Sequence, residues 1–194
     1  MVSHLLTEGN ATHASYMRAA QGGLPIVIHT GNKDVIASVI DLKRQYPQLQ
    51  LVIMGGAEAS FLAEHLAEAD IPVILAPWMC HPWSWDVRDC LPGPPLTEDT
   101  PASKLLDSGV KVALGNWDVR DRYVRNSLWE ASWIAGPRNA TLAVDLVSRN
   151  IQEILGLPET DHFVVYSGNP FEFGASVAVV FEQGEISLCW PDVE

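Results

Sequence analysis

Short apolar runs alternate with helical patterns from residue 24 to residue 114, and this alternation constrains the fold more than any other feature of the sequence. The first run, Leu24–Thr30, is rich in β-branched residues and lies between glycine-containing turns. This pattern predicts a strand that is buried on both faces. Strands that alternate with helices form parallel sheets, and ligands bind where the carboxyl ends of the strands meet the following loops. The predicted strands are 24–30, 49–54, 72–76 and 110–114, and the predicted helices between them are 33–45, 57–69 and 102–108.

The pattern changes beyond residue 115. Helices are predicted over 122–135 and 140–155, with Gly156 as a C-cap. Three short strands separated by turn residues follow, over 162–167, 176–181 and 186–190, which predicts an antiparallel meander. We therefore expect two parts: an α/β part over 1–157 with a partly helical lead-in, and a small β segment over 158–194.

The composition is typical of a folded protein with a strong acidic excess. Hydrophobic residues make up 47% of the 194 residues, and the formal net charge is −12. A negative chain repels phosphate backbones and anionic lipids, which argues against nucleic acid and membrane partners. The chain opens without a signal-like run, and no apolar run reaches the roughly 18 residues of a membrane span, so we expect a cytoplasmic protein. The scattered residues Cys80, Cys90 and Cys189 are expected to be reduced thiols.

The stretch 77–101 is rich in proline and tryptophan and is longer than most ordered connections. It is either a functional loop whose indoles line a substrate pocket or a small core beneath a long loop, and both interpretations remain open. Within it, Cys80-His81 is a possible nucleophile or metal pair, but with no second histidine or CxxC nearby we favour loop packing.

The closing segments carry a family resemblance. Residues 148–157 (SRNIQEILGL) and 161–172 (DHFVVYSGNPFE) follow the strand order described above, and a final hairpin contains Gly184. Together, over residues 24–194, they resemble the second half of the amidohydrolase superfamily barrel, nearest to the imidazolonepropionase-like branch. The resemblance implies a partial (β/α)8 TIM-type barrel, about strands five to eight, plus a small C-terminal β piece of a composite domain.

The resemblance also implies a metal site, with zinc as the expected ion. In the family the ligands come from H-x-H on strand one, often Lys or Glu on strand four, His on strands five and six, and Asp on strand eight. His29 takes the strand-five position, whereas Met54-Gly55-Gly56 occupies the strand-six position without a histidine. Asp118 meets the strand-eight position only with one inserted residue, where it would serve as ligand and general base. The six histidines include no H-x-H.

Each candidate also has a structural interpretation. His29 could donate to a backbone carbonyl, and Asp118 could cap a helix or pair with a nearby arginine. Glu58 follows the Gly-Gly turn at a predicted helix start, where the helix dipole favours a carboxylate for structural reasons. Trp78, His81 and Asn116 complete the predicted site as substrate-binding residues.

Four strands of an eight-stranded barrel leave two open edges that something must cover. The alternatives, in order of preference, are a missing N-terminal half, a second copy of the chain, or an open sheet with helices on both faces. We expect an amidohydrolase-related protein that acts on small molecules with non-peptide C–N bonds, such as cyclic amides, and is inactive as this chain. The rival hypothesis is a metal-free relative that binds a small molecule or a protein; a nucleotide module is disfavoured because no glycine-rich phosphate motif is present.

Overall fold

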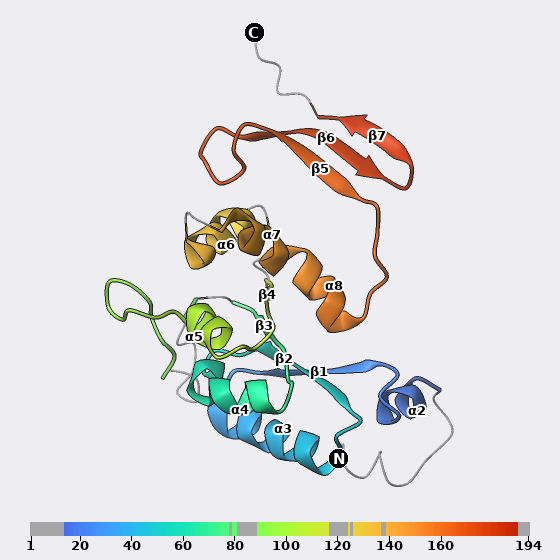
Figure 1. The fold of residues 1–194 in the computed structure, drawn as a ribbon, viewed down its shortest axis with the longest axis vertical. Coiled ribbons are helices and arrows are strands. Elements are labelled where there is room, and N and C mark those ends of the chain that lie inside the picture. The colour runs from blue at the N-terminus through green and yellow to red at the C-terminus, as the bar shows by residue number, and fades with distance from the viewer. Residues whose placement is uncertain are drawn as a thin grey trace.

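A four-stranded parallel sheet forms the centre of the larger part of the chain (Figure 1). The computed structural model describes residues 14–77, 79–80, 89–116, 124, 126–136 and 139–189. The strands lie in the order β1-β2-β3-β4, and all three pairings are parallel, as the alternating pattern predicted. Their bounds are β1 Pro25–Thr30, β2 Gln50–Gly55, β3 Val73–Leu75 and β4 Val112–Leu114.

Two helices of this part, α3 and α5, begin where side-chain caps satisfy their first amides. The Asn32 side chain accepts hydrogen bonds from the amides of Asp34 and Val35 at the start of α3. Thr100 and Ser103 form a capping box at the start of α5. The predicted helix 57–69 is instead a 3-10 turn followed by a short α-helix. The bounds are α2 Ala14–Ala20, α3 Lys33–Gln45, η1 Ala59–Leu62, α4 Ala63–Glu68 and α5 Pro101–Asp107.

Helices contact both faces of the parallel sheet. On one face, Ile53, Leu75 and Leu114 join the main core with side chains from α3, α4 and α5. The alternate strand positions, Val52, Ile74 and Ala113, point to the other face and pack against α8. Helices therefore lie on both faces of the four strands.

Three further helices, α6 Ser127–Ala135, α7 Ala140–Val147 and α8 Arg149–Leu155, follow the sheet. The predicted single helix over 140–155 is wrong, because Ser148 has φ −135° and ψ −86° and separates α7 from α8. Asn150 then donates to the carbonyl oxygen of Val112 at 2.7 Å, and Lys111 pairs with Glu153. These contacts fix α8 against the edge strand β4.

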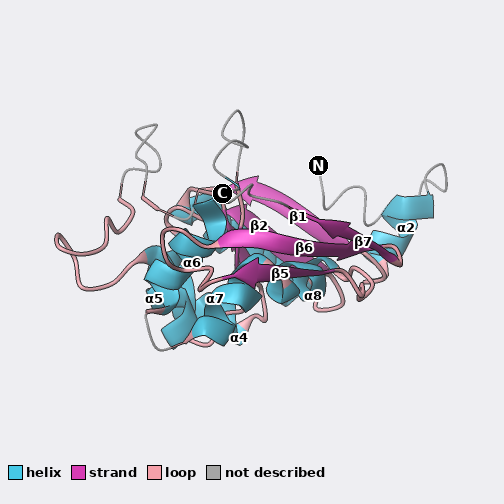
Figure 2. Cartoon of the chain, turned by 90° about the horizontal axis from the view of Figure 1, so that it is seen from above, coloured by secondary structure: helices cyan, strands magenta, loops and turns pink. Residues whose placement is uncertain are grey.

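A second, antiparallel sheet confirms the predicted meander. It consists of β5 Phe163–Ser167, β6 Ser176–Glu182 and β7 Glu185–Leu188, in that order. Figure 1 shows helices α6–α8 between the two sheets, and Figure 2 gives the view from above. Many apolar side chains of this sheet are exposed, with Ile186 and Leu188 each 66% accessible. Within the described ranges, no helix is long and apolar enough to cross a membrane.

Candidate functional site

The carboxyl ends of the four strands lie side by side at one edge of the parallel sheet. Register pairs Thr30 with Gly55, Gly55 with Leu75, and Leu75 with Leu114. His29 lies at the end of β1, and Asn116 follows β4 by two residues. Both predicted residues therefore lie at the carboxyl-terminal end of the sheet. The strands β1 and β4 are the outermost of the four, so two strands separate them.

His29 lies on the face of the sheet that α8 partly covers. Its register partner is Met54, which pairs in turn with Ile74, and paired residues of parallel strands point to the same face. His29 is exposed and also makes an interaction within the protein. An exposed imidazole at the end of a strand is accessible to a small molecule.

Gly55 is the middle residue of Met54-Gly55-Gly56, the stretch that the resemblance places at the strand-six ligand position. Its φ is +106°, a conformation that L side chains rarely adopt. A Cβ at this position would lie 2.8 Å from the carbonyl oxygen of Thr30 and 3.7 Å from Nε2 of His29. The backbone around Gly55 thus has no room for a side chain, and the absence of a histidine here has a structural reason.

Asn116 is fixed by the start of α6. Its Nδ2 atom donates to Oγ of Ser127 at 3.1 Å. Its role in substrate binding stays a prediction. The other predicted site residues, Asp118, Trp78 and His81, lie outside the described residues.

Glu58 has a more specific structural role than the sequence indicated. Its carboxylate is buried, with 2% of the residue exposed, and it makes no cap to its own 3-10 turn. Instead Oε2 accepts from the amide of Lys33 at 2.9 Å, and Oε1 accepts from the amide of Asp89 at 3.2 Å. Glu58 therefore joins the end of β2 to the first turn of α3 and to Asp89 after β3, through contacts other than the expected interaction with its own helix.

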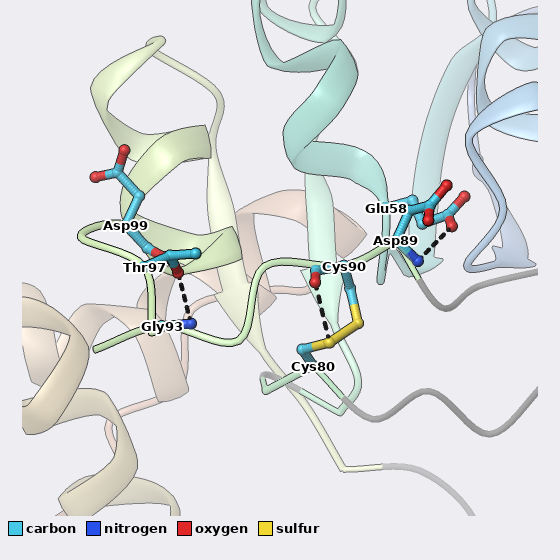
Figure 3. Close-up of a disulfide and its surroundings, with 7 residues drawn as sticks. All are labelled: Glu58, Cys80, Asp89, Cys90, Gly93, Thr97 and Asp99. Carbon is cyan, nitrogen blue, oxygen red and sulfur yellow. Dashed lines mark hydrogen bonds between the residues drawn. A yellow bond between two sulfur atoms is a disulfide. The ribbon is translucent and has the colours of Figure 1, made fainter. Parts of the chain in front are cut away.

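A disulfide lies beside this carboxylate (Figure 3). The expectation that all the cysteines are reduced is wrong, because Cys80 and Cys90 are bonded, whereas Cys189 is free and exposed. Their Cα atoms lie 5.3 Å apart although ten positions separate the two residues in the sequence. Sequence spacing alone did not reveal this pairing.

An ion pair adds a second contact at the same place. Nζ of Lys33 lies 2.6 Å from Oδ2 of Asp89. This hydrogen bond is the main reason why the pKa of Lys33 is raised above its usual value. Both side chains are well exposed to solvent, so the pair contributes less to stability than the buried Glu58 contacts.

The described residues do not complete the metal site that the family resemblance implies. They contain no group of three or more His, Cys, Asp or Glu side chains that could hold an ion. His29 is the one predicted ligand among them, and Met54-Gly55-Gly56 at the end of β2 contains no side chain of these four types. A catalytic zinc site usually has three protein ligands, and the predicted ligand Asp118 is not described.

With this geometry in place, sequence and structure comparisons indicate the class of protein. No family model matches the chain. Over 117 residues it is 44% identical to amidohydrolase tasK of Hapsidospora irregularis, a match that covers 58% of this chain and 12% of that protein. The chain is thus related to the amidohydrolases, as the sequence predicted.

Two crystal structures share its fold. One is an amidohydrolase from Thermotoga maritima MSB8, with a TM-score of 0.71 and 23% identity over 88% of this chain. The other is an uncharacterized protein, with a TM-score of 0.57 and 16% identity over 84% of this chain. The chain spans 45% of each of those structures.

Proposed function

We propose that this chain provides the second half of an amidohydrolase-type barrel in a protein that hydrolyses non-peptide C–N bonds of small molecules. The observation that carries the proposal is the pair of amidohydrolase matches, one in sequence and one in structure. The structural match extends over 88% of the chain and includes strands that end at one common edge. Active sites of barrel enzymes lie at this end of the strands.

In this proposal the open edges of β1 and β4 pair with strands that the chain itself does not supply. Edge strands carry unpaired amide and carbonyl groups, which a closed barrel satisfies. The missing strands come from an N-terminal half, or from a second copy of the chain. Until they are in place, we expect the chain to be inactive.

His29 and Asn116 are the described residues that we assign to the substrate. An imidazole ring and an amide side chain can both donate and accept hydrogen bonds. Both groups suit a planar amide such as a cyclic imide or lactam. Zinc stays an expectation from the family, and we derive no catalytic step through it.

A second candidate function is a metal-free binding module. Two observations favour it: Met54-Gly55-Gly56 contains no histidine at the strand-six position, and α8 covers part of the face that a barrel would enclose. In this case His29 and Asn116 bind a ligand without turnover.

Metal analysis combined with an amidase assay tests both candidates. The purified chain and the longest product of its gene are analysed for zinc and incubated with dihydrouracil and hydantoin. Hydrolysis by the longer product that is lost in His29→Ala, but retained in Cys189→Ser, supports the hydrolase. Binding of either compound without zinc or turnover supports the binding module, whereas stoichiometric zinc and turnover in the isolated chain would contradict its expected inactivity.

A further inference from the structure

We propose that Cys80 and Cys90 form a redox-sensitive pair that controls how firmly the segment after β3 is attached to Glu58. The inference rests on the position of the disulfide and is independent of the proposed hydrolase activity. Cys90 is the immediate neighbour of Asp89, whose amide donates to the buried Glu58 carboxylate (Figure 3). The disulfide therefore holds Cys90, and the hydrogen bond to Glu58 holds the preceding residue, Asp89.

The contacts of Asp89 connect the disulfide to the loops that follow β1 and β2. Asp89 contacts Glu58 through its amide and Lys33 through its carboxylate, and Glu58 also accepts from the amide of Lys33. Lys33 is the first residue of α3, four positions after His29. A change in the position of Asp89 therefore affects two contacts directly, with Glu58 and with Lys33, and these two residues also contact each other.

The two sulfur atoms differ in their access to a soluble thiol. Cys90 is only 6% exposed, whereas Cys80 is partly exposed. Exchange depends on access to the attacked sulfur, so a small thiolate such as glutathione attacks Sγ of Cys80. The disulfide breaks, Cys90 leaves as a thiolate and takes up a proton, and glutathione stays bound to Cys80. A second glutathione thiolate then attacks the bound glutathione sulfur, which releases Cys80 as a thiol and one molecule of glutathione disulfide.

The reduced pair stays close enough to form the bond again. Sγ of Cys80 lies 3.2 Å from the carbonyl oxygen of Cys90. Once reduced, the thiol of Cys80 can donate a weak hydrogen bond to this oxygen. This contact keeps the sulfurs adjacent, which a reversible switch requires.

Hydrogen exchange followed by mass spectrometry tests the inference. The protein is compared in oxidised and reduced glutathione, and the peptides that contain the amides of Asp89 and Lys33 are followed. We expect reduction to increase exchange at the Asp89 amide about tenfold, which is the effect of losing one hydrogen bond to a charged acceptor. Peptides from β2 should be unchanged.

Three variants make the test specific. Cys80→Ser with Cys90→Ser should show the fast exchange of the reduced protein in both buffers, and Cys189→Ser should respond as the unmodified protein does. Glu58→Gln should weaken the response at Asp89 while mass analysis still shows the disulfide forming. The inference fails if oxidised glutathione produces no Cys80–Cys90 bond, or if exchange at Asp89 is the same in both redox states.

Discussion

Replacement of the buried Glu58 carboxylate should destabilise the protein more than replacement of an exposed carboxylate nearby. Glu58→Ala removes the acceptor of two backbone amides, those of Lys33 and Asp89. A hydrogen bond to a charged group contributes about 1.5–3 kcal/mol to stability. A buried amide left without a partner destabilises the fold by its free energy of desolvation. Lys33 and Asp89 are not fully buried, so water can reach their amides in part, and the low end of the range applies.

The expected loss in the free energy of unfolding is therefore about 3 kcal/mol for Glu58→Ala, two hydrogen bonds at the lower value. Glu58→Gln keeps the shape and one oxygen acceptor but turns an NH2 group toward the other amide, so we expect about half that loss. The measurement is urea unfolding followed by far-ultraviolet circular dichroism, in oxidised glutathione so that the disulfide is the same in all variants.

The matched control is Glu64→Ala, which removes an exposed carboxylate from α4 a few residues away. A substitution of this kind usually changes stability by less than about 0.5 kcal/mol. If Glu58→Ala is no more destabilising than Glu64→Ala, the argument that the carboxylate holds the segment after β3 is refuted.

Three further predictions concern the core, a helix cap and an ion pair. Leu146→Ala empties a fully buried position on α7 and should cost about 2–5 kcal/mol in the same unfolding assay. Thr100→Ala removes the hydroxyl that accepts from the amide of Ser103 and should cost about 1 kcal/mol. Lys111 lowers the pKa of Glu153 below its usual value of 4.5, mainly through their hydrogen bond, so Lys111→Met should raise that pKa in a carboxyl-carbon NMR titration. The stability from this pair should be present above pH 4.5 and be lost as the pH falls through the lower pKa of the folded state, and Lys111→Met should remove this pH dependence.

Local signals in the sequence were sufficient to predict the regular elements of the sheet. Asn32 caps α3 and Pro47 follows its end, and the predicted helix 33–45 is confirmed to the residue. The break at Ser148 was not predictable in this way, because the apolar period runs through it. The Asn150 contact with the Val112 carbonyl joins residues 38 positions apart.

In the candidate site, only the positions that follow from the order and direction of the strands could be predicted from the sequence. Since parallel strands end at one edge, His29 and Asn116 were expected to lie at the same edge, and they do. The Glu58 contacts join residues 25 and 31 positions apart, and the disulfide joins two cysteines ten positions apart whose spacing does not indicate a bond. Such contacts follow from the packed structure and have no local pattern.

The small antiparallel sheet has a consequence for how the protein behaves at high concentration. Phe163, Val164 and Val165 are consecutive residues, so they point to both faces of β5, and each is about half exposed. The neighbouring run 177–181, VAVVF, has high β-propensity and no charge. Segments of this kind pair with copies of themselves unless charged residues interrupt them. Glu182 and Glu185 stand at the hairpin between β6 and β7 and can act as gatekeepers against fibre growth. Salt screens the repulsion between these charges on neighbouring copies, so high salt is the condition that would favour aggregation of this sheet.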